Sequence, residues 1–197
     1  DILKIIFGFQ EKATINEIKV HTPFLSENRI IKLYPYARTA LYVFLKSLNL
    51  EKGSEIIISG AHIPGFIQVI LELNLIPVIL DIETDTFCID ANKLQNSFSN
   101  KSKVLIITYL FGYVPNIEKI FKSIPKEIII VEDISQAIGA SFNSKKLGTF
   151  GHVSITSTSL GKFLDGSGGC IMSLVKDFQK LELDKIEKNI LKNPSIK

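Results

Sequence analysis

The sequence predicts an α/β fold with a mostly parallel central sheet that is flanked by helices. From about residue 36, amphipathic stretches with a helical period alternate with short runs of β-branched residues, and turn residues separate the two. Such alternation is typical of βαβ units, whose strands lie parallel in one sheet. The 197 residues are 46% hydrophobic and 22% charged, which fits a globular chain and excludes a disordered, collagen-like or coiled-coil one.

Helices and strands can be assigned in order through this repeating region. The first helix is expected over residues 38–50, because its apolar residues share one face and Lys52-Gly53 follows as a stop signal. A second helix is expected from Pro64, which suits a first helical turn, to about residue 74. The apolar runs between helices predict strands that are buried on both faces. Strands are expected over 55–59, 77–81, 103–108 and 127–131, and further helices over 91–97 and 116–123.

The two ends of the chain differ from this repeating region. Residues 1–35 show no clear rhythm of strands and helices, and we expect them to pack on the domain or on a partner. We expect residues 36–174 to form the main domain. Its last part is rich in Gly, Ser and Thr, with short strands expected over 140–142, 153–156 and 170–174. Residues 175–197 are rich in Lys and Glu with spaced apolar residues, which predicts a helix that ends before Pro194.

Charge and composition argue against several classes of function. The net charge is +3 and the lysines are scattered between apolar runs, so we expect no nucleic-acid partner. No apolar run approaches the ~20 residues of a membrane span, and the first residues lack the basic leader of a signal peptide. Cys88 and Cys170 follow no metal or redox spacing, which suggests a reducing, cytoplasmic location. His21, His62 and His152 lie far apart, so we expect no metal site.

Two polar residues stand out after the repeating units. The apolar run 128–133 ends in Glu132-Asp133, and ligands bind at the carboxyl edge of open α/β sheets. Asp133 is therefore either a site carboxylate or the cap of a helix that begins near Ile134, and the sequence leaves both open. Lys162 is isolated among small residues ahead of Gly168-Gly169, where a backbone can approach a cofactor closely; an ordinary loop lysine is the alternative.

Four motifs are informative through their order and spacing. They are residues 40–58, 77–90 (PVILDIETDTFCID), 131–140 (VEDISQAIGA) and 157–169 (STSLGKFLDGSGG). With them, residues 36–174 resemble the cofactor-binding large domain of the DegT/DnrJ/EryC1/StrS family of pyridoxal-phosphate-dependent sugar aminotransferases. The resemblance implies the aspartate-aminotransferase fold type I, pyridoxal 5′-phosphate as cofactor and a homodimer. It also implies transfer of an amino group, usually from glutamate, to a nucleotide-linked keto sugar.

The resemblance assigns roles to individual residues. It makes Lys162 the catalytic lysine, which carries the cofactor as a Schiff base, and Asp133 the partner of the pyridine nitrogen. It makes Gln136 the neighbour of the ring's phenolic oxygen and Ser157 a phosphate ligand. A carboxylate at the ring nitrogen keeps the ring protonated, so that the ring can absorb electrons from the substrate.

The first helix and the loop after residue 59 complete the site that the resemblance implies. Arg38, Thr39 and Ala40 match the family's turn at a helix start, where backbone N–H groups and the helix dipole hold the phosphate. The family usually has a small residue where Arg38 stands. It often has an aromatic residue that stacks on the cofactor ring, and the candidates here are His62 and Ile63.

Length is the largest departure from the family. Members are much longer and have a small carboxyl-terminal domain, so residues 175–197 are expected to be the start of a domain that this sequence lacks. Apolar residues of that tail should then lie exposed and favour self-association; they are Phe178, Leu181, Ile186 and Ile190. The alternative function is a non-catalytic or truncated form that is kept for binding, assembly or regulation. A dehydratase of the same family is disfavoured, because those enzymes carry His in place of Lys162.

Overall fold

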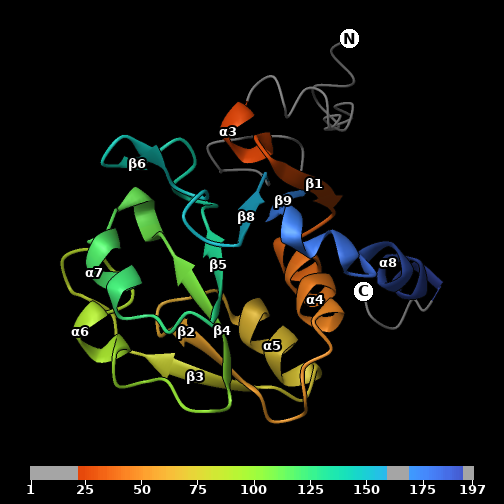
Figure 1. Cartoon of the computed structure of the whole chain (residues 1–197), viewed down its shortest axis with the longest axis horizontal. Helices are drawn as coiled ribbons and strands as arrows, with labels where there is room; N and C mark the ends of the chain where they lie inside the picture. Colours follow the sequence, from red (N-terminus) through yellow and green to blue (C-terminus); the bar gives the residue numbers. More distant parts are fainter. Residues whose placement is uncertain (1–21, 159–168, 193–197) are drawn as a thin grey trace.

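The computed structural model describes residues 22–158 and 169–192, and a seven-stranded sheet forms its centre (Figure 1). Its strands are β1 (Arg29–Tyr34), β2 (Glu55–Ser59), β3 (Ile76–Leu80), β4 (Ser102–Thr108), β5 (Ile129–Asp133), β8 (Val153–Ser157) and β9 (Cys170–Val175). They lie in the order β1-β9-β8-β5-β4-β2-β3. The strands β2, β3, β4, β5 and β8 run parallel, whereas β9 is antiparallel to both of its neighbours. The predicted fold class, a mostly parallel α/β sheet, is confirmed.

Helices cover both faces of the sheet (Figure 1). They are α3 (Pro23–Ser26), α4 (Ala37–Ser47), α5 (Pro64–Glu72), α6 (Ala91–Leu94), α7 (Ile117–Lys122) and α8 (Leu183–Lys192), with 3-10 turns η1 (Leu110–Gly112) and η2 (Lys176–Lys180) and a hairpin of β6 (Ser141–Phe142) and β7 (Lys145–Lys146). The helices α4, α5 and α8 bury their apolar residues against one face of the sheet, and α3, α6 and α7 against the other. Within the described residues, no helix is long and apolar enough to span a bilayer.

The central strands are apolar on both faces, which explains why helices cover both faces of the sheet. In β4, Val104 and Ile106 belong to the core under α4 and α5, whereas Leu105 and Ile107 belong to the core under α6 and α7. All four are buried, because successive side chains of a strand point to opposite faces of the sheet and helices cover both faces. The expected bounds of β2 are confirmed, while several other elements start or end a few residues from their expected ends.

The edge strand β1 was not predicted. It pairs antiparallel with β9, from Arg29 opposite Val175 to Tyr34 opposite Cys170, so it belongs to the main sheet although it lies within residues 1–35. Its pattern is hard to recognise because Lys32 interrupts the apolar run. Lys32 forms an ion pair with Asp184 of α8, and the Tyr34 hydroxyl donates to Glu187 of the same helix at 2.7 Å.

The carboxyl-terminal segment also packs on this domain, against our expectation. Phe178, Leu181 and Ile186 are half-buried on the core under α4, and Leu183 is buried there. The Phe178 ring meets the Phe44 ring edge-on, with centroids 5.6 Å apart. The expectation that these side chains form an exposed surface was wrong, because η2 and α8 fold back onto α4 and β1 and cover them; the side chain of Ile190 lies outside the described residues.

Candidate functional site

The carboxyl ends of the parallel strands meet at one edge of the sheet, and this edge holds the predicted site residues. Thr108 and Asp133 are the last residues of β4 and β5 and stand opposite each other in the ladder. Ser157, the last residue of β8, is opposite Cys170, which in turn is opposite Tyr34 at the end of β1. Because α4 and α5 follow β1 and β2 after short loops, their first turns lie at the same edge. Strands and helices that are far apart in the sequence therefore meet at this edge.

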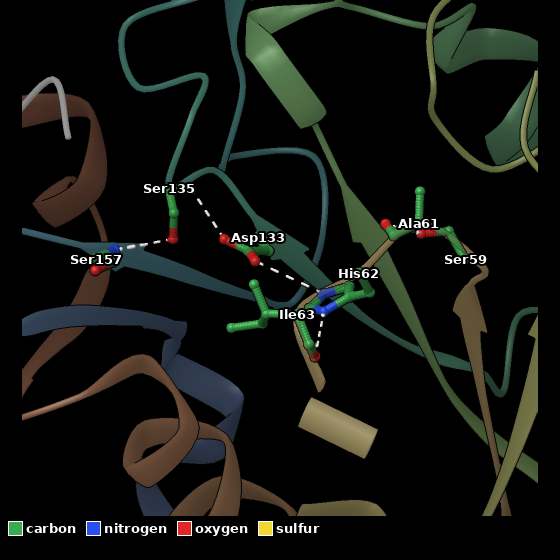
Figure 2. A network of polar contacts seen from close by, with 7 residues as sticks. All are labelled: Ser59, Ala61, His62, Ile63, Asp133, Ser135 and Ser157. Atoms are coloured by element: carbon green, nitrogen blue, oxygen red, sulfur yellow. Dashed lines mark hydrogen bonds and ion pairs between the residues drawn. The ribbon is translucent and has the colours of Figure 1, made fainter. Parts of the chain in front are cut away.

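The two carboxylate oxygens of Asp133 have different surroundings. Its side chain is buried, and Oδ1 accepts a hydrogen bond from the amide of Ser135 at 3.0 Å. Residues after Asp133 form turns and no helix begins at Ile134, so the helix-cap interpretation is wrong. The second oxygen, Oδ2, faces the imidazole of His62, with Nε2 at 3.7 Å (Figure 2). One oxygen thus fixes the backbone and the other is directed into the site.

His62 lies in the loop between β2 and α5, with its side chain only 2% exposed. The imidazole packs on the Phe66 ring, with centroids 4.4 Å apart, and Nδ1 lies 3.3 Å from the carbonyl oxygen of Ile63. Within the described residues, Nε2 is buried and has no hydrogen-bond partner. Burial lowers the pKa of His62, and the Asp133 carboxylate acts in the opposite direction. A buried imidazole with one face on Phe66 is poorly placed to stack on a ligand.

Ile63 is exposed, whereas the side chain of its neighbour His62 is buried. It is the N-cap residue of α5, and 49% of its surface is exposed. Figure 2 shows its side chain beside Asp133 and His62. Of the two candidates for the ring-stacking position, Ile63 is the one with a free apolar surface. The sequence left the choice between His62 and Ile63 open because it does not show which side chain is buried.

Ser135 links Asp133 to β8. Its amide donates to Asp133, and its hydroxyl oxygen accepts a hydrogen bond from the Ser157 amide at 3.0 Å (Figure 2). This chain of contacts places Ser157 next to the Asp133 turn, as expected for two residues of one site. We did not predict Ser135; its position two residues after an aspartate, where an aspartate side chain commonly accepts a backbone hydrogen bond, was the signal that could have found it.

Gln136 is directed toward the turn that follows β4. Its Oε1 accepts a hydrogen bond from the Phe111 amide at 2.8 Å. Phe111 has a φ of 54°, in the left-handed region that non-glycine residues rarely adopt, so this bond supports an unfavourable backbone conformation. The acceptor end of the Gln136 side chain is therefore committed, and its amide nitrogen is the end that remains for a ligand oxygen.

The first turn of α4 places Arg38, Thr39 and Ala40 differently. Arg38 is exposed, and its guanidinium lies over the Tyr36 ring, 4.2 Å from the centroid. A Cβ at Gly65 would lie 3.7 Å from the Arg38 Cδ, so the arginine reaches the first turn of α5. Thr39 is half-buried, whereas Ala40 is fully buried in the core. The Ala40 amide donates to the Tyr36 carbonyl oxygen at 3.1 Å, so the predicted role of Ala40 in holding a phosphate is wrong: neither its methyl group nor its N–H is available.

The Glu132 side chain lies on the face of the sheet opposite that of Asp133, because successive side chains of a strand point to opposite faces. It is fully buried and accepts hydrogen bonds from the Tyr109 hydroxyl at 2.9 Å and from the amides of Gly148 and Gly151 at 2.8 and 2.5 Å. Burial raises the pKa of Glu132, and these three bonds oppose the increase. Glu132 thereby holds the turn at residues 148–151, which leads into β8 and so to Ser157.

Lys162 lies outside the described residues, and its predicted role stays a prediction. The flanking residues are described: the Thr158 amide donates to the carbonyl oxygen of Gly169 at 2.9 Å. Thr158 and Gly169 therefore lie side by side next to Ser157, at the edge of the sheet where β5 ends in Asp133.

The site has the polar groups that a protonated pyridine ring requires. Asp133 offers a buried carboxylate oxygen, and His62 Nε2 and Thr108 Oγ1 are buried polar atoms without a hydrogen-bond partner among the described residues. Buried polar atoms of this kind are rare in folded proteins and often mark a place where a ligand or water supplies the partner. The residues present therefore fit pyridoxal phosphate, the cofactor that the sequence resemblance implies.

Comparisons with proteins of known sequence agree with this description. The chain is 27% identical over 154 residues to L-glutamine:2-deoxy-scyllo-inosose aminotransferase from Streptomyces kanamyceticus, which covers 76% of this chain and 36% of that protein. It is 26% identical to GDP-perosamine synthase from Vibrio cholerae, over 68% of this chain and 37% of that protein. The chain thus spans well under half the length of these relatives.

Solved structures and the family model complete the comparison. An aminotransferase from Psychrobacter cryohalolentis superposes with a TM-score of 0.74 at 20% identity, over 82% of this chain and 42% of that one. The E. coli GDP-4-keto-6-deoxy-D-mannose-3-dehydratase with bound hydrated PLP gives 0.76 at 21% identity, over 89% and 47%. The model of the DegT/DnrJ/EryC1/StrS aminotransferase family matches residues 37–180, which is most of the chain. This chain belongs to the DegT/DnrJ/EryC1/StrS aminotransferase family.

Proposed function

We propose that this chain binds pyridoxal phosphate and forms the cofactor-binding part of an aminotransferase that acts on a nucleotide-linked keto sugar. The observation that carries the proposal is the Asp133 carboxylate, buried at the carboxyl edge of the sheet with one oxygen held by Ser135 and the other directed into the site. Membership of an aminotransferase family supports the class of reaction.

Each part of the cofactor has a candidate residue. Asp133 Oδ2 would accept a hydrogen bond from the pyridine nitrogen, and Ile63 would cover one face of the ring. The amide nitrogen of Gln136 would donate to the phenolic oxygen. The phosphate would be held by Arg38 and Thr39 in the first turn of α4 and by Ser157 at the end of β8. The first turn of α4 has neither a side-chain cap nor an acidic residue that would compete with an anion.

The residues of this chain would then divide the work of transamination. When bound, pyridoxal phosphate supplies an electron sink for the negative charge that develops at the substrate carbon. Asp133 would keep the proton on the ring nitrogen, because an ionised carboxylate favours the charged form of its partner. The Lys162 amine would carry the cofactor and would then move a proton between the substrate Cα and the cofactor C4′, acting as general base and acid.

The substrates are proposed from the relatives. GDP-perosamine synthase is named for a nucleotide-linked amino sugar, which supports a nucleotide-linked keto sugar as acceptor. We propose glutamate as the amino donor; the Streptomyces kanamyceticus relative is named for L-glutamine, so both donors belong in the test. We also propose a cytoplasmic homodimer, in which a second copy completes the substrate pocket.

The first experiment addresses cofactor binding. We expect purified protein to bind added pyridoxal phosphate with a new absorption band, and borohydride reduction followed by peptide mapping should place the adduct on Lys162. Lys145, in the exposed β6–β7 hairpin, provides a matched control for lysine removal. A protein that acquires neither the band nor the adduct would refute the proposal.

The second candidate is the alternative function that the sequence analysis named. In it, the chain binds the cofactor but serves in assembly or regulation without turnover. A half-reaction decides between the two: loss of the absorption band on adding glutamate or glutamine supports an aminotransferase. A stable band with both donors supports the non-catalytic form.

A further inference from the structure

We propose that His62 is a positioning residue that orients the Asp133 carboxylate through Nε2 and thereby sets how tightly the site holds a protonated pyridine nitrogen. This inference rests on the proposed function, because it concerns how Asp133 meets the cofactor. It gives His62 a role other than the stacking role that the sequence suggested.

The first argument is the way in which the two groups face each other. His62 Nε2 and Asp133 Oδ2 are 3.7 Å apart, and their side chains are 2% and 7% exposed. Nε2 is buried without a hydrogen-bond partner among the described residues, although an imidazole nitrogen that is buried usually finds one. A shift of less than 1 Å by either side chain would bring the pair into hydrogen-bond distance, which is about 2.7–3.2 Å.

The second argument is that the imidazole is held in place by its other contacts. Phe66 covers one face of the ring, at an interplanar angle of 34°. The His62 side chain is only 2% exposed, so its position is fixed by packing. Nδ1 lies 3.3 Å from the carbonyl oxygen of Ile63, but in the neutral tautomer that carries its proton on Nε2 this nitrogen is an acceptor and makes no hydrogen bond there. His62 cannot turn away from Asp133 without losing the Phe66 contact, and it therefore presents Nε2 to the carboxylate.

The third argument concerns the remaining freedom of Asp133. Its Oδ1 is fixed by the Ser135 amide at 3.0 Å, which sets the position of the carboxylate but permits rotation about the bond to it. A donor at Oδ2 would fix the rotation as well. A carboxylate oxygen accepts two hydrogen bonds, so His62 and a pyridine N–H can share Oδ2 without competing, provided that His62 donates from its neutral ring.

The neutral form of His62 is the one that suits this role. An imidazolium would place a second positive charge on the carboxylate that has to hold a pyridinium. The charged group that faces the imidazole is Asp133 at the end of β5. Arg38 of α4 reaches Gly65 in the first turn of α5. Burial favours the neutral ring and Asp133 favours the cation, and burial is the larger influence on the pKa of His62.

Two substitutions separate hydrogen bonding from packing. His62→Gln keeps a neutral N–H donor at the position of Nε2, and His62→Leu keeps the volume and the apolar contact with Phe66 but removes the donor. We expect the dissociation constant for pyridoxal phosphate, measured by absorbance titration, to rise about ten- to a hundredfold in His62→Leu and to stay within about threefold of the parent in His62→Gln. If the two variants bind equally well or equally poorly, His62 contributes packing only and the inference is overturned.

A measurement without cofactor makes the result independent of the proposed function. The pKa of the His62 imidazole can be followed by NMR in the parent protein and in Asp133→Asn. We expect this pKa to fall in the variant, because the carboxylate that raises it has been neutralised. An unchanged pKa would show that the two groups do not interact and would overturn the inference. Failure of the parent protein to bind pyridoxal phosphate would refute the proposed function, and the NMR comparison would still decide the pairing.

Discussion

Gly148 and Gly139 allow the cost of crowding to be separated from the cost of a left-handed backbone. Their φ angles are +86° and +84°, in the region where a side chain is strained. A Cβ at Gly148 would lie 2.8 Å from Ile134 Cδ1 and 3.3 Å from Ser154 Cβ, whereas a Cβ at Gly139 would meet nothing within 4 Å. Alanine at either position therefore brings the same backbone strain, and only Gly148→Ala adds a collision.

The expected magnitudes follow from these two contributions. A left-handed conformation costs an alanine about 1–2 kcal/mol. An extra methyl group forced into a well-packed core costs about 1–3 kcal/mol more. We expect Gly139→Ala to lower the free energy of unfolding by about 1–2 kcal/mol and Gly148→Ala to lower it by about 2–5 kcal/mol. The Gly148 amide also donates to Glu132, so displacement of this turn weakens a buried hydrogen bond as well.

Urea unfolding followed by circular dichroism measures both variants against the parent protein. The slope of the unfolding free energy against urea concentration must be the same in all three proteins, so that a shift of the midpoint reports a change in stability. Equal losses in the two variants would refute the reasoning, because they would show that the turn at residues 148–151 moves freely enough to accept a side chain.

Four further predictions follow from the site and the core. Asp133→Asn should weaken pyridoxal phosphate binding about ten- to a hundredfold in an absorbance titration, because the bond to the pyridinium loses its charge. Lys162→Ala should abolish the borohydride-stable adduct, as detected by peptide mapping. Phe178→Ala should lower the free energy of unfolding by about 1–3 kcal/mol without changing the mass found by light scattering, because the half-buried ring packs on Phe44. The free energy of unfolding should fall as the pH drops below 6.5, because burial lowers the pKa of His152 in the folded protein and the unfolded chain then binds more protons.

Matched controls accompany these predictions. Asp81 is exposed, and Asp81→Asn should leave cofactor affinity unchanged; an equal loss there would indicate a general charge effect. Leu71 is 56% exposed, and Leu71→Ala should cost far less stability than Phe178→Ala. His152 Nδ1 accepts a hydrogen bond from the Ile130 amide at 3.0 Å, which protonation would break. In His152→Asn an amide oxygen can take that place, so this variant should lose part of the acid sensitivity; a profile identical to that of the parent would contradict the assignment.

The sequence predicted the centre of the fold better than its edges. Central strands such as β4 and β5 are continuous apolar runs, because both faces of the sheet are covered, and such runs are easily recognised. The edge strand β1 was missed because Lys32 faces α8 and finds its partner there, which no local pattern reveals. The packing of Phe178 on α4 was missed for a similar reason, since the segment looked like the start of another domain.

The site was predictable where position along a strand determines it. Asp133 was placed correctly at the carboxyl edge, because it ends an apolar run that could only be a buried strand. The orientation of His62 could not be predicted, because it depends on Phe66 in the next helix and on Asp133 in a strand two positions away in the sheet. Spacing along the sequence does not reveal contacts between side chains of different helices and strands.

The pairing of β1 with β9 also determines the order in which this chain can fold during synthesis. The Arg29 side chain bonds to Ser173, 144 residues later in the chain, so β1 leaves the ribosome long before β9, with which it pairs in the sheet, exists. Closing so long a loop is entropically costly and slow compared with pairing β2 with β3 and β4, and β4 with β5. Until β9 emerges, β1 has unpaired backbone groups along its length, which can join the strand of another nascent chain. Lys32, which obscured the strand in the sequence, places a charge in the middle of that unpaired segment and so opposes its association with a second copy.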